Sequence, residues 1–586
     1  MNSKRQSKTP NMKSIDGNEK GLALITALVL VALLAIVGTI SVNTTYTDIM
    51  ISGNYKDSMR AFYAAEGGAE YGFNRLRQQF ITKLYPDNSD LNTVVNDFFA
   101  DITGTSTAMS GYTFGNFTVV QTVGTTTATP ITSGNYSGLS ALVERYDITS
   151  EAGTGTASAK VVLSAEDYLI PLLQFAVFYE DDLEIHPGPG MVFNNGWIHS
   201  NSDIYLGANN TLSIDSKTTS AGDILNYRKT TGNEQNVNGI VQFKNGAGDY
   251  QAMKQDEDGD GVDEILDSTR SDWMTESQNR WDGMVKSKDH GINSIDLVPM
   301  PTGSDEIEII KEGDALDPGS SSELSTNPDL ANTRYYWKAG LRILDGIAYD
   351  KNGGFLDLTD GGNLLNPISN ETLWDAREEE WITVTTVDME LLGTNFVATT
   401  ALANGSEQGI LYVSESALNK GVRLVKGQVL PSGGFTVASE NPIYIQGDYN
   451  TANAPAAVLG DAVTILSNGW DDANSNSYGA RNAVDTTINA AIVSGNVEST
   501  LGGDYSGGLE NLPRFLENWA GRTLTYSGSM VCLWQSEKAT GSWGKSNVYS
   551  PPNRNWSYGL NVNNMPPGTP FVRVVQKVGW YQDINQ

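Results

Sequence analysis

The most continuous apolar stretch of the chain lies close to its start. No charged side chain occurs between Gly21 and Thr47. As a helix these residues reach roughly 40 Å, enough to cross a bilayer core of about 30 Å. Beyond Asp48 the apolar residues recur mostly at steps of three or four as far as Phe80, which is the stripe of an amphipathic helix. The pattern predicts one long helix, uniformly apolar in its first half and one-sided in its second.

A different pattern follows this helix. The segments "TFGNFTVVQTV", "LVERYDITSEA" and "ASAKVVLSAEDY" alternate apolar and polar residues between Gly, Ser and Thr turns. This alternation predicts an antiparallel meander on which the one-sided half of the helix lies. Residues 84–110 are polar and rich in Thr and Ser, and predict a loop or a small insertion.

From about residue 171 the strands become very short. Asn, Gly and Ser turns separate the predicted strands Trp197–His199, Ile204–Leu206 and Leu212–Ile214. Similar short strands, again separated by turns, are predicted between residues 435 and 500. Short strands at irregular spacing predict the stacked rungs of a β-solenoid or a sandwich with many hairpins. No fixed repeat length is visible, so both alternatives stay open.

These patterns together predict an α+β protein: a long N-terminal helix packed on an antiparallel sheet, then a large mainly-β region with an inserted calcium-loop segment. The predicted divisions are a basic leader (1–21), the helix (22–78), the antiparallel sheet (79–170), the first part of the β-rich region (171–230), a charged insertion (231–340) and the main part of the β-rich region (341–586).

The distribution of charge predicts how the chain is oriented in a membrane. The net charge is −31, yet the first twenty residues carry +3, which leaves −34 for the rest. A basic flank before an apolar span predicts that the N-terminus stays in the cytoplasm and that the bulk is translocated. No Lys and Arg cluster suited to phosphate contacts is present, so nucleic acid is excluded as a partner. Cys532 is the only cysteine, so no internal disulfide forms.

The segments "KGLALITALVLVALLAIVG" and "ISGNYKDSMRAFYAAEGGAEYG" resemble the N-terminal domain of PilX-type minor pilins. The resemblance implies that prepilin peptidase cuts between Gly21 and Leu22 on the cytoplasmic side. It also implies that the apolar half of the helix first anchors the subunit in the inner membrane and then packs among other helices in the filament core. Major pilins carry a glutamate at the fifth mature position, where this chain has Thr26. PilX-type and tip-type minor pilins often lack that glutamate, so the departure points away from a bulk subunit.

Two other interpretations of the apolar segment remain. An ordinary cleaved secretory signal has a shorter apolar region and an A-x-A site, which does not follow here. A plain single-span anchor fits the hydropathy equally well.

The insertion contains "DEDGDGVDEILD", which has the spacing of an EF-hand calcium loop. Alternate carboxylates on a curling backbone converge on one hard cation, and Gly261 supplies the sharp turn at position 6. The predicted ligands are Asp256, Asp258, Asp260, the carbonyl of Val262, Glu264 and Asp267.

This loop departs from the EF-hand pattern at two positions. Asp263 replaces an apolar residue, and Asp267 replaces the longer glutamate at position 12. A weaker site is therefore expected, and magnesium or a solvated acidic turn remains as an alternative. The segment "SDWMTESQNRWDGMVKS" follows, with Trp273, Trp281 and Met284 on roughly one face of a predicted helix.

The residues do not indicate an enzyme. The chain has three histidines, no HExxH and no G-x-S-x-G, and Cys532 lies in the apolar run "GSMVCLWQ", which predicts a buried thiol. The last third is rich in aromatic residues that could form a contact surface for a glycan or protein, or cap the ends of the β core: Trp470, Trp519, Trp534, Trp543, Trp556 and Trp580.

The resulting hypothesis is a non-catalytic minor pilin that takes part in type IV pilus assembly, tip formation or adhesion. Its implied partners are other pilins, the pilus assembly platform, prepilin peptidase and the inner membrane, together with a surface glycan or protein. The precursor would be a single-pass inner-membrane protein, and the mature form would be periplasmic or extracellular in a pilus. The alternative is a membrane-anchored periplasmic or surface binding protein that never enters a filament.

Overall fold

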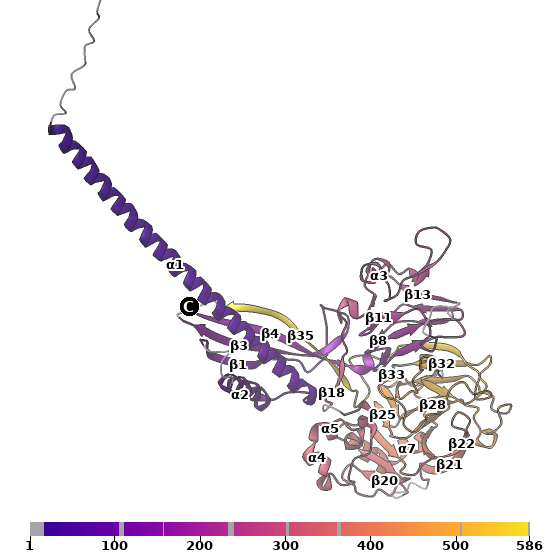
Figure 1. The fold of residues 1–586 in the computed structure, drawn as a ribbon. Coiled ribbons are helices and arrows are strands. Elements are labelled where there is room, and N and C mark those ends of the chain that lie inside the picture. Colours follow the sequence, from indigo (N-terminus) through magenta and orange to yellow (C-terminus); the bar gives the residue numbers. More distant parts are fainter. Residues whose placement is uncertain are drawn as a thin grey trace, which may run out of the picture.

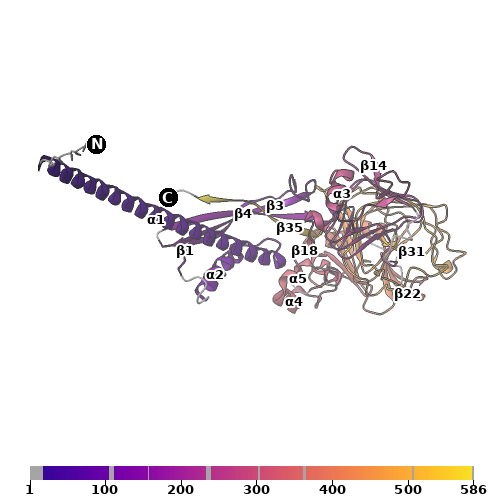
Figure 2. The same ribbon diagram turned by 45° about the horizontal axis from the view of Figure 1, so that its top comes forward.

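A computed structural model describes residues 17–104, 111–155, 157–231, 239–300, 304–359, 365–503 and 507–583. Residues 1–16 of the predicted leader lie outside the described residues. A single rod-like helix, α1 (Gly17–Thr82), leads into a sheet that runs along its second half, and a large β domain follows beyond the end of the helix (Figures 1 and 2). The predicted α+β architecture is confirmed.

The second half of α1 packs through small residues. Its buried stripe steps by three or four residues through Ala61, Ala65, Ala69, Phe73, Leu76 and Phe80. A Cβ atom added at Gly68 would lie 2.2 Å from Ser150 Oγ, and one added at Gly72 would lie 2.7 Å from Ile148. Glycines that weaken an isolated helix therefore allow α1 to lie close against the sheet.

The sheet under α1, here called the head sheet, contains the predicted antiparallel meander of β1 (Thr113–Gly124), β3 (Ser140–Thr154) and β4 (Ala157–Pro171). The short β2 (Thr129–Pro130) pairs with β3. The expectation of a loop at residues 84–110 was wrong over most of its length, because α2 (Asn88–Gly104) occupies it. The helix buries Leu91, Val94 and Phe98, which recur at helical spacing. Because these three apolar residues lie among many polar ones, the pattern did not predict the helix.

Two further strands join the head sheet from distant parts of the chain. β35 (Phe571–Asp583) pairs antiparallel with β4 along its length, and β18 (Asp296–Val298) pairs with the start of β35. The sheet order is β1-β3-β4-β35-β18. Residues 571–583, predicted as part of the C-terminal β-rich region, instead complete the N-terminal sheet (Figure 1).

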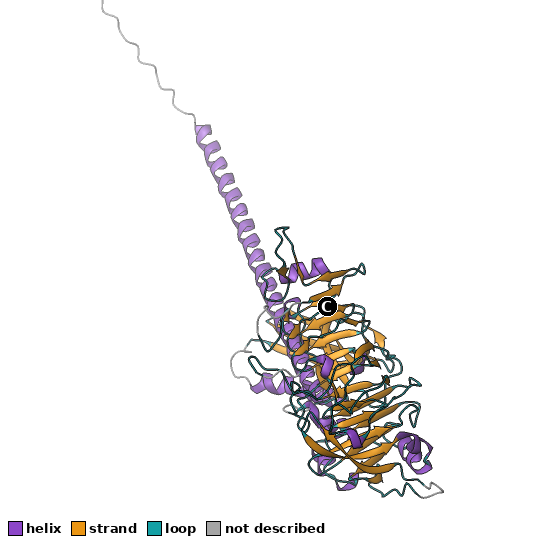
Figure 3. Ribbon diagram, turned by 90° about the vertical axis from the view of Figure 1, so that its right-hand side faces the viewer, coloured by secondary structure: helices purple, strands orange, loops and turns teal. Residues whose placement is uncertain are grey.

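The large β domain is a solenoid, one of the two predicted alternatives. Successive strands from Val177 to Lys244 and again from Ala456 to Cys532 visit three sheets in turn, whereas those from Ile410 to Gln446 alternate between two of them. Strands of successive turns pair in parallel (Figure 3). The long sheet has the order β17 (Val285–Lys286), β11 (Lys217–Ser220), β8 (Trp197–Ser200), β5 (Val177–Tyr179), β33 (Met530–Cys532), β30 (Ala491–Ser494), β27 (Ala456–Gly460), β25 (Phe435–Ala438), β23 (Ile410–Ser414), β19 (Leu341–Leu344) and β20 (Ile347–Asp350).

The other sides of the solenoid are each formed by two shorter sheets. The second side contains β12 (Ile224–Leu225), β9 (Ile204–Leu206) and β6 (Leu183–Ile185), then β21 (Ile368–Asp375), β22 (Glu380–Asp388), β24 (Lys420–Val425), β26 (Ile443–Gln446), β28 (Val463–Leu466) and β31 (Pro513–Phe515). The third contains β14 (Tyr250–Ala252), β13 (Ile240–Lys244), β10 (Thr211–Ile214) and β7 (Met191–Phe193), then β29 (Thr486–Asn489), β32 (Thr523–Ser527) and β34 (Asn553–Ser557).

The chain enters the solenoid in the middle. It winds from β5 to β17, crosses to the far end, and winds back from β19 until β33 pairs with β5, with Met530 opposite Val177. The crossing residues 287–300 and 304–340 include α4 (Ser322–Thr326), α5 (Pro328–Thr333) and α6 (Tyr335–Lys338). Ile310 and Tyr336 of this crossing belong to the same buried cluster as Tyr412 of β23. Much of the predicted charged insertion therefore covers the outer face of the long sheet.

Candidate functional site

The first half of α1 has no covering in the structure. Every residue from 21 to 56 is exposed, although most of the side chains up to Val42 are apolar. The helix is long and apolar enough to cross a membrane. A contiguous apolar surface of this size indicates contact with lipid or with other helices.

The predicted processing residues lie at the beginning of this exposed helix. Gly21 and Leu22 are both exposed, and a Cβ atom added at Gly21 would meet nothing within 4 Å. Thr26 donates its hydroxyl to the carbonyl of Leu22 at 2.9 Å. Its polar group is thus satisfied inside the helix, and nothing at this position requires a charged partner in the membrane.

The other end of α1 is fixed by a buried arginine of β35. Arg573 donates to the carbonyl oxygens of Phe80, Lys83 (2.8 Å) and Leu84 (2.5 Å), which lie at or just beyond the last turn of α1. The final carbonyls of a helix have no intrahelical donor, so the guanidinium serves as the C-terminal cap. Arg573 also forms a 2.9 Å ion pair with Asp167 of β4.

Both members of this pair are buried, and the pair joins three elements at one point. Burial raises the pKa of Asp167 to about 7, and the charge of Arg573 acts in the opposite direction. Further along β35, Lys577 lies 2.5 Å from Glu70 of α1, and the Trp580 ring lies 5.6 Å from that of Phe62. These contacts were not predicted. The one indication of them in the sequence is Arg573, a charged residue within the otherwise apolar stretch "FVRVV".

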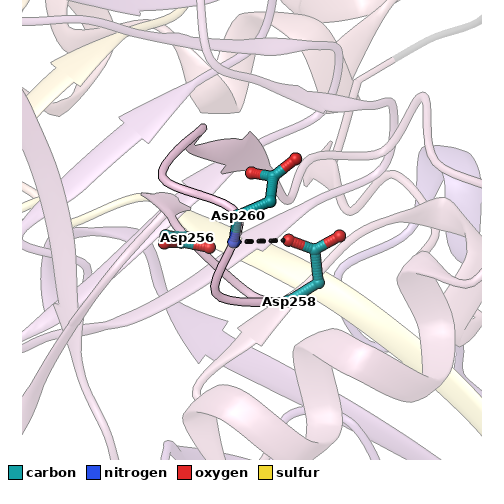
Figure 4. Close-up of side chains that lie close together, drawn as sticks. All are labelled: Asp256, Asp258 and Asp260. Carbon is teal, nitrogen blue, oxygen red and sulfur yellow. Dashed lines mark hydrogen bonds between the residues drawn. The ribbon is translucent and has the colours of Figure 1, made fainter.

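The acidic loop lies between β15 (Lys254–Gln255) and β16 (Glu264–Ile265). Carboxylate oxygens of Asp256, Asp258 and Asp260 lie within 4.8 Å of one another, and all three side chains are exposed (Figure 4). Asp256 accepts hydrogen bonds from the amides of Gly259 (2.6 Å) and Gly261 (3.0 Å). These bonds curl the backbone so that the alternate carboxylates face one another.

Two of the remaining predicted ligands, Glu264 and Asp267, already accept hydrogen bonds from the protein. Glu264 accepts from the amide of Glu257 at 2.8 Å, and the Val262 side chain is exposed. Asp267 is buried, and its two carboxylate oxygens accept hydrogen bonds from Thr269 and from the amide of Asn226. The predicted helix after the loop is present as α3 (Trp273–Trp281), with both tryptophans buried.

Most of the aromatic residues singled out in the last third belong to the core. Trp470, Trp519, Trp534 and Trp556 are buried, and the Trp543 indole donates to the Tyr549 hydroxyl at 2.6 Å. Trp580 is exposed but lies on the head sheet. These rings therefore fill and close the β structure, which was the second of the two alternatives.

The residues considered for catalysis are also buried. Burial raises the pKa of the Cys532 thiol, which agrees with an inert buried cysteine. Burial lowers the pKa of His186 and of His199 to about 4. Within the described ranges, three metal-ligating side chains converge only at the acidic loop.

Comparison with known proteins identifies the helical segment. Residues 20–70 match the family model described as PilX N-terminal. This stretch of α1 is similar to the PilX N-terminal domain. The resemblance inferred from the sequence is thereby confirmed for the exposed first half of α1 and for the beginning of the half that packs on the head sheet. Among curated proteins, none matches this chain.

A solved structure that aligns with this chain is that of the competence-associated pilin ComZ from Thermus thermophilus. The alignment covers 90% of this chain and 98% of ComZ at 14% sequence identity, with a TM-score of 0.26.

Proposed function

We propose that this protein is a non-catalytic minor pilin of a type IV pilus or a related filament. One observation carries the proposal: the PilX N-terminal domain is a single helix whose first half is entirely exposed while its second half is fixed on a sheet. In this arrangement α1 is first held in the inner membrane with the N-terminus in the cytoplasm. After cleavage by prepilin peptidase between Gly21 and Leu22, it packs among the helices of other pilins.

The solenoid supports a position at or near the tip of the filament. It extends beyond the C-terminal end of α1 and is much larger than the head sheet (Figure 1). A shaft subunit must leave room for neighbours on every side, whereas a terminal subunit has one free direction. Tip formation or adhesion is the role proposed for the solenoid, with the assembly platform and other pilins as partners.

Processing at Gly21 is the property that distinguishes a pilin from a plain anchor. We expect the wild-type chain isolated from membranes of its host to begin at Leu22, and the Gly21→Ala variant to keep its leader and to be absent from sheared filaments. Gly38→Ala is the matched control, because a Cβ atom at either glycine meets nothing within 4 Å. N-terminal sequencing and intact mass measure the outcome. A wild-type chain that begins at Met1 would favour the membrane-anchored binding protein instead.

We also propose that the loop at Asp256, Asp258 and Asp260 binds calcium. The convergence of three exposed carboxylates supports this proposal, and the Val262 carbonyl and Glu264 would complete the oxygen ligands. Because Asp267 is engaged elsewhere, we expect a weak site. Weak sites suit the millimolar calcium found outside cells, where the ion would stiffen the loop.

Calcium titration of thermal stability tests the metal proposal. At ten times its Kd the ion should stabilise the wild-type protein by about 1.4 kcal/mol, and a variant with Asn at positions 256, 258 and 260 should lose this gain. Asp357→Asn is the control, because Asp357 is also an exposed acidic turn residue. An equal gain in all three proteins would contradict the site, and a larger gain with magnesium than with calcium would assign it to magnesium.

A further inference from the structure

Exposed aromatic side chains of the solenoid gather at one of its ends. Phe355, Trp381 and Phe396 are 68%, 50% and 74% exposed. They come from the segment around β20, β21 and β22, at the end of the solenoid opposite α3 (Figure 1). This end also lies farthest from the start of α1. The packing of the core does not account for these rings, in contrast to the buried tryptophans of the last third.

Phe396 lines a groove of about 460 Å³ at this end. One wall is the turn after β20, with Asp350, Lys351 and Asn352, and the other is α8 (Phe396–Ala403) with the following Asn404. The volume lies in the range of small-molecule sites, which combine an apolar lining with a few polar groups.

Both walls are held in place before any ligand arrives. Asp350 accepts hydrogen bonds from the amides of Asn352 and Gly354, both at 2.8 Å, and these bonds fix the turn. Asn395 caps α8 by accepting from the amide of Ala398 at 3.0 Å, and its side chain donates to the carbonyl of Leu358 at 2.6 Å. A site fixed in this way loses little conformational entropy on binding.

The groups in the groove define the chemistry of its occupant. One carboxylate and one ammonium give no net charge, Asn352 and Asn404 offer amide donors and acceptors, and Phe396 offers an aromatic face. Amides match the neighbouring hydroxyls of a sugar, and the ring matches the C–H face of a pyranose. The strongly acidic chain repels anions, and an apolar peptide would leave the side-chain amides and the Lys351 ammonium without a hydrogen-bonding ligand.

We propose that this groove binds a neutral carbohydrate, with Phe396 stacked on a pyranose ring and the amides of Asn352 and Asn404 bonded to its hydroxyls. The inference deepens the proposed pilin function, on which its adhesive role rests, by naming the class of partner. Binding is measured on the purified chain, so failure here leaves the test of processing at Gly21 unaffected.

The experiment applies the full chain, in a detergent without a sugar headgroup, to a printed array. The array carries neutral hexose and N-acetylhexosamine oligosaccharides, sialylated and sulfated glycans, and apolar peptides. We expect binding to one or more neutral glycans. Phe396→Ala should weaken this binding about tenfold through loss of the stacking contact, and Asn352→Ala should also weaken it. Phe355→Ala is the matched control, because this equally exposed ring does not line the groove, and it should bind as the wild type does.

Several results would overturn the proposal. They are binding to no neutral glycan, binding restricted to the anionic glycans or to the peptides, and an equal loss in Phe396→Ala and Phe355→Ala. Thermal melting of each variant establishes that the folded protein was compared.

Discussion

The head sheet draws its strands from distant parts of the chain, whereas most solenoid strands pair with strands one turn away. In the head sheet, β4 pairs with β35, so Pro171 lies opposite Phe571. In the solenoid, Val177, Ile198 and Thr218 are neighbours in successive turns, 21 and 20 residues apart. The solenoid can therefore stabilise itself turn by turn, while the head sheet requires a strand that follows the whole solenoid.

Because of this difference, the head sheet and the solenoid are not two consecutive segments of the chain. The solenoid is an insertion between β4 and β35, two adjacent strands of the head sheet, and the short strand β18 of that sheet comes from within the insertion. A contact such as Arg573 with the end of α1 consequently spans almost five hundred residues of sequence. Damage to the head and damage to the solenoid should be separable.

The largest effect is expected for Arg573→Met. The substitution removes the cap of α1 and leaves Asp167 buried without its partner, a situation that costs about 3–5 kcal/mol in other proteins. Denaturant unfolding measures the loss, and amide exchange should increase in residues 61–84 of α1 and in β4. Lys577→Met on the same strand is the control. Its ion pair with Glu70 is about 40% exposed on both sides and is worth at most about 1 kcal/mol. Equal losses in the two variants would contradict the special role of Arg573.

A smaller effect in the other region is expected for Ile492→Ala. This side chain of β30 is fully buried in the solenoid core, and its truncation should cost about 3 kcal/mol. Amide exchange should rise in β27, β30 and β33, which are neighbours in the long sheet, and stay unchanged in α1. Faster exchange throughout the head sheet would show that the two regions unfold as one unit, which would contradict the expectation that they can be destabilised separately.

The smallest effect concerns pH and the buried His199. Its ring nitrogens bond to Thr219 Oγ1 (2.8 Å) and Asn201 Oδ1 (2.9 Å), and its pKa in the folded protein is about 4. Because this lies below the ordinary 6.5, the unfolded chain takes up the proton first as pH falls. The contribution of His199 to stability is complete above pH 6.5 and declines toward pH 4, by about 2 kcal/mol at pH 5.

The His199→Gln variant removes the titrating imidazole and therefore isolates its pH-dependent contribution to stability. The gap in unfolding free energy between the wild type and the variant should shrink by that amount from pH 7 to pH 5. Buried carboxyls such as Asp461, whose pKa is raised by burial, act in the opposite direction but equally in both proteins. A gap that does not depend on pH would contradict the buried neutral imidazole.

The elements with a local pattern could be predicted from the sequence. The spacing of three or four between apolar residues in α1, and the alternation of apolar and polar residues in β1, β3 and β4, involve only residues that are close in sequence. The same is true of the curl of the loop at Asp256. The very short strands β8, β9 and β10 were also found, although their arrangement in a solenoid remained one of two alternatives. The PilX N-terminal resemblance covers the same local pattern in α1.

Features that depend on distant partners could not be predicted. The spacing between equivalent residues grows from 21 to 34 between Ala457 and Ala491, and to 50 between Val463 and Pro513, because loops enter between turns. No fixed repeat survives these insertions. Asp267 has the spacing of a calcium ligand, but Asn226 and Thr269 use both of its oxygens. Likewise, nothing in "FVRVV" reveals that Arg573 meets the end of α1.

Two of the links between the head sheet and the solenoid leave the sheet side by side, after Pro171 and before Phe571, and the other two flank β18. A pull on the solenoid therefore reaches α1 along two strands at once instead of through a single tether. Since β4 is paired along its whole length with β3 and β35, the tension runs parallel to these strands, and many hydrogen bonds share it. If one of these links were severed, the others would still hold the solenoid under traction.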